Sequence, residues 1–151
     1  MRFCRCARAN GTERVAAYAD SSLIVAASNS QDEFHQAAEH WFTGQSDPVI
    51  TSVIAEVEVH RALRRQVTAP KLHSQAEHLL RNCIAIEITR KVRRLAATLG
   101  PTRLRSLDAI HVATALLAEA DEFATFDLRQ QIAAEEAGLT VPDLALPSRE
   151  H

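Results

Sequence analysis

The chain has 151 residues, and 46% of them are hydrophobic. This length and composition suit one domain with a complete core and exclude an intrinsically disordered protein. The apolar runs are far too short to cross a bilayer, and no apolar stretch of the kind found in secretory signals follows the first arginines. We therefore expect a cytoplasmic protein that does not bind membranes.

The net charge of −2 hides a strong segregation of charge along the chain. Residues 1–14 carry four Arg and one Glu, and residues 15–58 carry seven acids and no Lys or Arg. Residues 59–105 carry eleven basic residues against two acids, whereas residues 106–151 carry nine acids and two Arg. An acidic centre beside a basic surface is what a metal-dependent enzyme acting on a polyanion needs.

The three cysteines do not indicate a disulfide framework, because their number is odd and two of them, Cys4 and Cys6, are crowded at the N-terminus. Cys4 and Cys6 also lack a second pair of ligands at zinc spacing. Residues 1–14 show no clear periodicity and are predicted to be a flexible N-terminal extension. Residues 15–151 are predicted to form a single domain.

Short apolar runs of strand type alternate with helical patterns along the rest of the chain. In chain order, the patterns predict a strand over Val15–Ala19, a helix around Phe34–Trp41, a strand over Pro48–Thr51, helices over Val53–Arg65 and Lys71–Asn82, a strand over Ile84–Ile88, helices around Val92–Leu99 and Leu107–Glu119, a strand over Phe123–Thr125, a helix over Leu128–Ala137 and a strand over Thr140–Val141. Strands that alternate with helices indicate a parallel sheet covered by helices on both faces. We therefore predict an α/β fold with about five short strands, each buried on both sides.

Four acids sit at the ends of these elements or inside a helical pattern: Asp20, Glu58, Asp108 and Asp127. Asp20 and Asp127 follow predicted strands, so both should point into the crevice at the carboxyl edge of a parallel sheet. Each also has a structural explanation, because Asp is a favoured helix N-cap residue. Gln130 follows Asp127 by three positions, as in a capping box.

Asp108 and Glu58 belong to helical patterns. With Ser106 as the N-cap, Asp108 falls in a first helical turn, where the helix dipole favours a carboxylate by roughly 0.3–1 kcal/mol. Glu58 lies in the middle of a helix, and its structural alternative is a surface ion pair with Arg61, worth about 0.2–0.5 kcal/mol. His111 lies one turn after Asp108, and a packed, hydrogen-bonded histidine is favoured there over a metal ligand or a base.

Carboxylates that converge must be neutralised. Two of them about 4 Å apart repel by roughly 4 kcal/mol at an effective dielectric constant of about 20. A divalent cation removes this cost, and all-oxygen ligands select Mg²⁺ or Mn²⁺ over Zn²⁺. Hydroxyl side chains that could orient the carboxylates, or simply cap helices, are Ser22, Thr51, Ser52 and Thr125. Metal-assisted hydrolysis is therefore the leading hypothesis from the residues alone.

Four motifs resemble those of the PIN-domain ribonucleases, and most closely those of the VapC toxins of bacterial type II toxin–antitoxin pairs. They are Tyr18-Ala19-Asp20-Ser21-Ser22, Thr51-Ser52-x5-Glu58-Val59-x-Arg61-Ala62-Leu63, Leu104-Arg105-x-Leu107-Asp108-Ala109-Ile110-His111-x-Ala113-Thr114-Ala115 and Thr125-Phe126-Asp127. Each motif alone is weak, but four in the right order and spacing, over residues 15–142, form a specific signal. Residues 1–14 depart from the family, whose members begin almost directly with the first strand.

The resemblance implies a three-layer α/β/α sandwich with a parallel sheet in the order 3-2-1-4-5. It also implies endonucleolytic cleavage of RNA, commonly transfer or ribosomal RNA, with Mg²⁺ or Mn²⁺. Asp20 and Asp108 resemble the principal metal ligands, with Asp127 as a further ligand. Glu58 and Asp127 would hold metal-bound water and help to deprotonate the nucleophile. The implied partners are a VapB-like antitoxin, whose tail blocks the site, and a second copy of the chain in a homodimer.

Arginines of the basic block are predicted to position the RNA backbone, and we select Arg61, Arg65 and Arg105. Two rival functions share some of these features. A phosphoaspartyl phosphatase with Asp20 as nucleophile would need a second carboxylate two residues later, where Ser22 stands. A non-catalytic RNA- or antitoxin-binding module of the same fold stays open as the alternative.

Overall fold

The computed structural model describes residues 15–66, 69–101 and 103–144. The predicted extension at residues 1–14 lies outside these ranges. The described strands are β1 (Ala17–Ala19), β2 (Ile50–Ser52), β3 (Ile84–Ile86) and β4 (Glu122–Ala124). The described helices are α1 (Ser21–Ser28), α2 (His35–Thr43), α3 (Ile54–Leu63), α4 (Ala69–Asn82), α5 (Arg90–Thr98), α6 (Ser106–Leu117) and α7 (Leu128–Glu136).

The strands form one parallel sheet in the order β3-β2-β1-β4. Parallel neighbours need crossover connections, which the intervening helices supply. The predicted fifth strand is reduced to a parallel bridge between Thr140 and Glu122, beside β4. Two backbone bonds hold it there, from Phe123 N–H to the Thr140 carbonyl at 2.8 Å and from Thr140 N–H to the Asp121 carbonyl at 3.1 Å. The predicted order is thus confirmed, with a last strand shorter than predicted.

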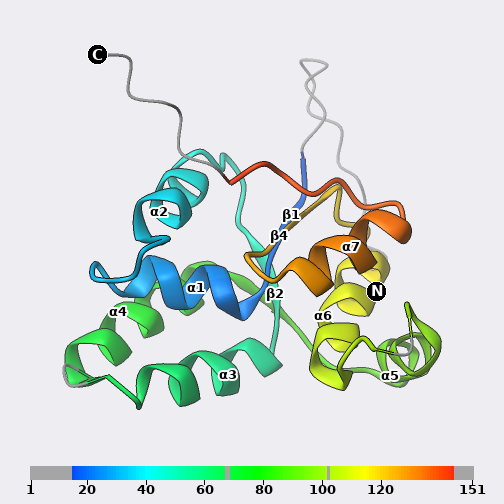
Figure 1. Ribbon diagram of the computed structural model, residues 1–151, viewed down its shortest axis with the longest axis horizontal. Coiled ribbons are helices and arrows are strands. Elements are labelled where there is room, and N and C mark those ends of the chain that lie inside the picture. Colours follow the sequence, from blue (N-terminus) through cyan, green and yellow to red (C-terminus); the bar gives the residue numbers. More distant parts are fainter. Residues whose placement is uncertain (1–14, 67–68, 102, 145–151) are drawn as a thin grey trace.

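Helices cover both faces of the sheet, with α1 and α2 on one side of the strands and α6 and α7 on the other (Figure 1). The alternation of side chains along β1 directs Tyr18 to the core beneath α6 and α7. Ala17 and Ala19 face the core beneath α1 and α2. The predicted three-layer α/β/α sandwich is therefore confirmed.

The prediction that every strand is buried on both sides is wrong for β3. Ile84 and Ala85 are exposed, and Ile86 is half-buried. The reason is position, because β3 is an edge strand with a sheet neighbour on one side only. A separate cluster, with Ile24 of α1 and Val59 of α3 among its members, joins α1 to the α3–α4 pair.

The topology fixes where a site can form. The chain moves from β1 to β2 and β3 on one side and returns to β4 on the other, so the topological switch point lies between β1 and β4. Open α/β sheets bind ligands outside the carboxyl ends of the strands at such a point. Asp20 directly follows β1, and Asp127 follows β4 after two residues.

Within the described ranges, every helix falls short of the length and apolar character that a bilayer crossing requires.

Candidate active site

Asp20 is a buried N-cap at the switch point, with only 1% of the residue exposed. Its Oδ1 accepts hydrogen bonds from the Ser22 hydroxyl at 2.6 Å and from the Leu23 backbone N–H at 3.3 Å. Its Oδ2 accepts from the Thr125 hydroxyl at 2.8 Å. Burial raises the pKa of the Asp20 carboxyl, and nearby His111 and the two hydroxyls oppose that rise. The predicted cap is confirmed, but a cap does not need burial, which penalises a charged group.

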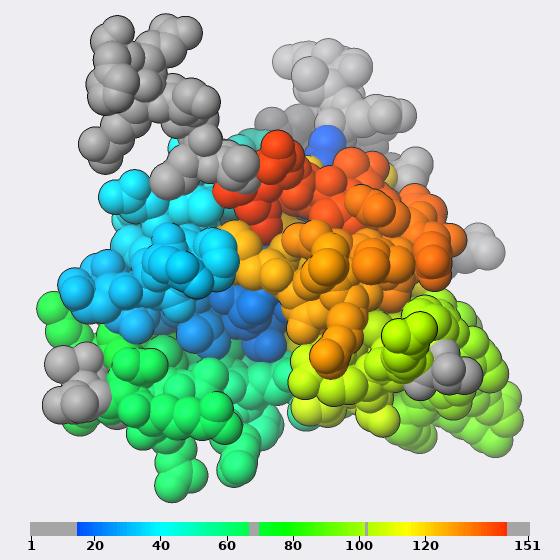
Figure 2. Space-filling model, viewed as in Figure 1, coloured from blue at the N-terminus to red at the C-terminus, as the bar shows by residue number. Residues whose placement is uncertain are grey.

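Thr125 connects Asp20 to Asp127. The Thr125 hydroxyl, which donates to Asp20, also accepts from the backbone N–H of Asp127 at 3.0 Å. Asp127 in turn caps α7, because its Oδ1 accepts from the backbone N–H groups of Arg129 at 2.8 Å and Gln130 at 3.3 Å. The starts of α1 and α7 are therefore side by side, as the blue and orange surfaces near the centre of Figure 2 show.

Arg105 connects Asp127 to Asp108. Its Nε donates to Asp108 Oδ2 at 3.1 Å, and its Nη2 donates to Asp127 Oδ2 at 3.3 Å. Asp108 is 5% exposed, and its Oδ1 accepts from the side-chain amide of Gln130 at 3.0 Å. The hydrogen bond and charge of Asp108 raise the pKa of the Arg105 guanidinium further. One hydrogen-bonded chain thus runs from Asp20 to Asp108 through Thr125, Asp127 and Arg105.

Two local predictions are wrong at this junction. Ser106 is not the N-cap of α6, because the helix begins at Ser106 and Arg105 is the N-cap, without a side-chain capping bond. Gln130 does not complete a capping box with Asp127, because its amide reaches Asp108 of the neighbouring helix. Asp108 nevertheless falls in the first turn of α6, as predicted.

Glu58 belongs to a second hydrogen-bonded chain. The Tyr18 hydroxyl lies 2.7 Å from His111 Nδ1, and His111 Nε2 contacts the Glu58 carboxylate. Burial is the main cause that raises the pKa of Tyr18 well above its ordinary value, so the hydroxyl keeps its proton. An ionised carboxylate can only accept, so Nε2 carries a proton, and in a neutral imidazole Nδ1 then accepts from Tyr18. The prediction of a packed, hydrogen-bonded His111 is confirmed, and Glu58, with 23% of its side chain exposed, is not an ordinary surface residue.

The three predicted RNA-contacting arginines differ in position. Arg105 contacts two of the acids, whereas Arg61 is exposed on α3 and Arg65 is exposed just beyond its end. Among the hydroxyl residues, Ser22 and Thr125 bind Asp20. The other two bind backbone groups. The Thr51 hydroxyl donates to the Ala19 carbonyl at 2.8 Å, and the Ser52 hydroxyl accepts from the Ile54 N–H at 3.3 Å.

The chemistry of the donors fits a hard divalent cation. Asp20, Asp108 and Asp127 supply carboxylate oxygens, and the buried Oε1 of Gln130 has no hydrogen-bond partner within the described part of the chain. Oxygen ligands of this kind suit Mg²⁺ or Mn²⁺. In residues 15–66, 69–101 and 103–144, however, no three His, Cys, Asp or Glu side chains are arranged to hold a metal ion. Asp108 and Asp127 are instead arranged around the guanidinium of Arg105.

Tyr18 and Gln130 were not predicted as parts of this site, although Tyr18 opens the first of the four motifs. Tyr18 stands in an ordinary strand pattern, and Gln130 has a local capping interpretation. Only the packing of α6 against β1 and α7 shows that they support His111 and Asp108.

Comparisons with known proteins identify the family of this chain. The family model of the PIN domain matches residues 17–136. Ribonuclease VapC47 of Mycobacterium tuberculosis is 34% identical over 126 residues, which cover 80% of this chain and 91% of that protein. The chain belongs to the PIN-domain family and, within it, to the VapC-like ribonucleases.

Solved structures show the same fold. The crystal structure of Mycobacterium tuberculosis VapC20, a sarcin–ricin loop cleaving toxin, matches with a TM-score of 0.68 at 18% identity, covering 83% of this chain and 97% of that one. A toxin–antitoxin complex from Klebsiella pneumoniae matches with a TM-score of 0.65 at 18% identity, covering 86% and 98%.

Proposed function

We propose that this protein is a divalent-cation-dependent endoribonuclease and the toxin of a toxin–antitoxin pair. Asp20, Asp108 and Asp127 would hold Mg²⁺ or Mn²⁺. When bound, such an ion polarises a phosphoryl oxygen and lowers the pKa of a water molecule, which favours hydrolysis of the phosphodiester bond.

The observation that carries this proposal is the burial of two carboxylates, Asp20 and Asp108, at the switch point of the sheet. A buried carboxylate costs folding free energy, and Ser22 and Thr125 satisfy the Asp20 oxygens without supplying a charge. A fold that needed only helix caps would lose nothing by leaving these acids exposed.

Glu58 is proposed as the group that takes the proton from the attacking water. The hydrogen bond from His111 Nε2 holds its Oε1, and Tyr18 fixes the imidazole in the tautomer that donates to Glu58. This hydrogen bond engages Oε1, and Oε2 would accept the proton. A positioned base of this type contributes about 10²–10⁴ to the rate.

Exposed arginines are proposed to bind the RNA backbone. Arg61 lies on α3 and Arg65 just after it, and α3 also carries Glu58. An RNA strand whose phosphates bind these arginines would therefore pass close to Glu58. Guanidinium groups bind phosphate oxygens in pairs and give affinity that is independent of sequence. The substrate class we propose is structured transfer or ribosomal RNA. The proposed protein partners are a VapB-like antitoxin and a second copy of the chain.

The test uses the full chain freed from any antitoxin, with total RNA and a ribosomal stem–loop as substrates, with EDTA, Mg²⁺ or Mn²⁺. We expect discrete cuts that require the metal, and a loss of about 10²-fold or more in Glu58→Gln. Glu56→Gln is the matched control, because Glu56 lies two positions away on α3 and is exposed. Its rate should stay within about twofold of wild type.

Two results would contradict this function. Cleavage that persists in EDTA, or equally in Asp20→Asn, would exclude the proposed metal-assisted chemistry. RNA binding without cleavage under every metal condition would instead support the alternative, a non-catalytic binding module.

A further inference from the structure

Arg105 lies between two of the three acids that would hold the proposed cation. Its guanidinium binds Oδ2 of both Asp108 and Asp127, at 3.1 Å and 3.3 Å. It thereby joins the first turns of α6 and α7, which carry those two acids. The positive charge of Arg105 reduces the repulsion between the carboxylates of Asp108 and Asp127, as a divalent cation between them would.

The guanidinium and a cation shared by Asp108 and Asp127 would compete for the same carboxylate oxygens. Mg²⁺ binds oxygen at about 2.0–2.1 Å, so an ion shared by Asp108 and Asp127 would approach the two Oδ2 atoms that Arg105 now holds. A guanidinium does not lose its proton in proteins, so it cannot become neutral to make room for the ion. A cation bound through these two Oδ2 atoms would therefore displace Arg105 from them.

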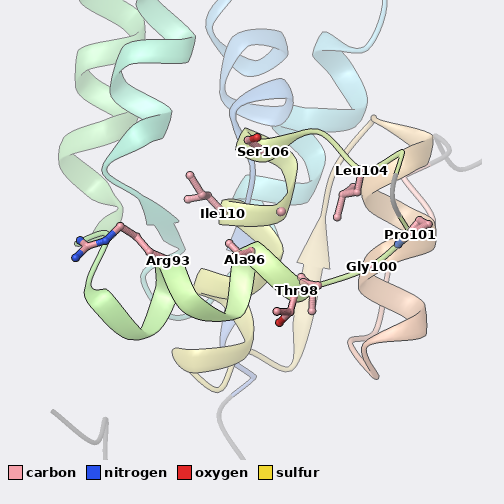
Figure 3. Close-up of a pocket in the computed structure, with 11 residues that line it drawn as sticks. Arg93, Ala96, Thr98, Gly100, Pro101, Leu104, Ser106 and Ile110 are labelled. Atoms are coloured by element: carbon pink, nitrogen blue, oxygen red, sulfur yellow. The ribbon is translucent and has the colours of Figure 1, made fainter.

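Arg105 has the freedom to move. Its side chain is 62% exposed, against 7% for Asp108 and 27% for Asp127. It stands between Leu104 and Ser106, which both line a cavity of about 460 Å³ between α5, α6 and the connecting loop. Figure 3 shows Leu104 of this loop and Ile110 of α6 beside that cavity. Asp108 lies within α6 and Asp127 caps α7, whereas the side chain of Arg105, the N-cap residue of α6, is mostly exposed and its guanidinium contacts the two acids.

We propose that Arg105 is a built-in counter-ion that holds Asp108 and Asp127 together in the metal-free protein and is displaced when a divalent cation binds. This inference rests on the proposed metal site. Metal binding is then a competition within the chain, and Arg105 sets the cation concentration at which the site becomes loaded. Release of Arg105 also makes its guanidinium available to a phosphate group.

The experiment measures Mn²⁺ affinity without RNA, by the loss of the free-ion electron paramagnetic resonance signal. Arg105→Gln removes the charge and keeps a side chain that can form hydrogen bonds. Arg103→Gln is the matched control, because Arg103 is an exposed arginine on the same connection and the change in net charge is equal. Arg105→Lys, which keeps the charge but loses the two-pronged geometry, is a second variant in case Arg105→Gln does not fold.

We expect Arg105→Gln to bind Mn²⁺ at least about fivefold more tightly than wild type, the lower end of typical coupling between two binding events. Arg103→Gln should change the affinity by less than about twofold, and Arg105→Lys should fall between wild type and Arg105→Gln. Detectable binding in wild type that Arg105→Gln leaves equal or weakens would overturn the counter-ion proposal alone. If neither wild type nor Arg105→Gln binds Mn²⁺, the proposed metal-dependent function fails as well.

Discussion

Removal of the Tyr18 hydroxyl tests the hydrogen-bonded support of Glu58. Tyr18 and His111 are fully buried, and the hydroxyl lies 2.7 Å from His111 Nδ1. In Tyr18→Phe the ring can keep its stacking on Phe123, with centroids 5.2 Å apart, so the change is confined to the hydroxyl. The buried Nδ1 loses its donor, which costs about 1–3 kcal/mol of unfolding free energy. A central value of about 2 kcal/mol lowers the Tm of a domain of this size by about 4–8 °C.

Urea denaturation measures this loss directly, and the midpoint should fall while the m-value stays constant. Thr114→Val is the matched control. It removes another buried hydroxyl from α6, but that hydroxyl donates only to the Ile110 carbonyl of its own helix. Its removal leaves the carbonyl bonded within the helix, so the expected cost is below about 1 kcal/mol.

A double-mutant cycle separates the hydrogen bond from changes in packing. Tyr18→Phe leaves His111 Nδ1 without its partner, and His111→Leu leaves the Tyr18 hydroxyl without its partner, whereas the double variant removes both atoms. His111→Leu also removes the contact with Glu58, but this loss is common to His111→Leu and the double variant and cancels in the cycle. The double variant should therefore lose less stability than the two single variants together, by about 1 kcal/mol or more. Additive losses, or a Tyr18→Phe protein as stable as wild type, would refute the reasoning.

Three further variants test burial, charge and the metal. In EDTA, Asp20→Asn should stabilise the protein, because burial raises the Asp20 pKa above its unfolded value. The stability that wild type draws from the protonated Asp20 carboxyl is present at low pH and is lost as the pH rises from about 4 through the raised pKa. The difference in Tm between Asp20→Asn and wild type should therefore grow over that pH range. A difference that stays constant with pH would contradict this. Leu63→Ala, at 1% exposure, should cost about 2–5 kcal/mol in urea, and Leu128→Ala, at 67% exposure, less than about 0.5 kcal/mol; similar losses would be inconsistent with the described core. Mn²⁺ should raise the Tm of wild type but not of Asp108→Asn in differential scanning fluorimetry, and an equal rise in both would argue against Asp108 as a ligand.

The parts of the fold that the sequence predicted well are the local ones. Asp20 and Asp127 stand between a short apolar run and a helical pattern, and both proved to be N-caps at the carboxyl edge of the sheet. Thr89, which stands just before the helical pattern around Val92–Leu99, likewise caps α5 by accepting from the Val92 N–H at 3.3 Å. Such features depend on neighbours within about four residues, which a sequence shows directly.

The parts that the sequence could not predict depend on contacts between distant elements. The exposure of β3 follows from its place at the edge of the sheet, although Ile84–Ile86 is as apolar as a central strand. Gln130 has a local capping partner available, yet it binds Asp108, 22 positions away. Arg105 has no pattern that distinguishes it from the other arginines of residues 59–105, and only the packing of α6 beside α7 places it between two acids.

The proposed function requires a divalent cation among the carboxylates at the switch point between β1 and β4. Anomalous diffraction from crystals soaked in Mn²⁺ tests it most directly, because the metal itself is located. We predict a peak in contact with carboxylate oxygens of Asp20 and Asp108, with the Arg105 guanidinium moved away from Asp127. At a Mn²⁺ concentration that saturates binding in solution, a peak elsewhere on the protein, or none near Asp20 and Asp108, would contradict the account.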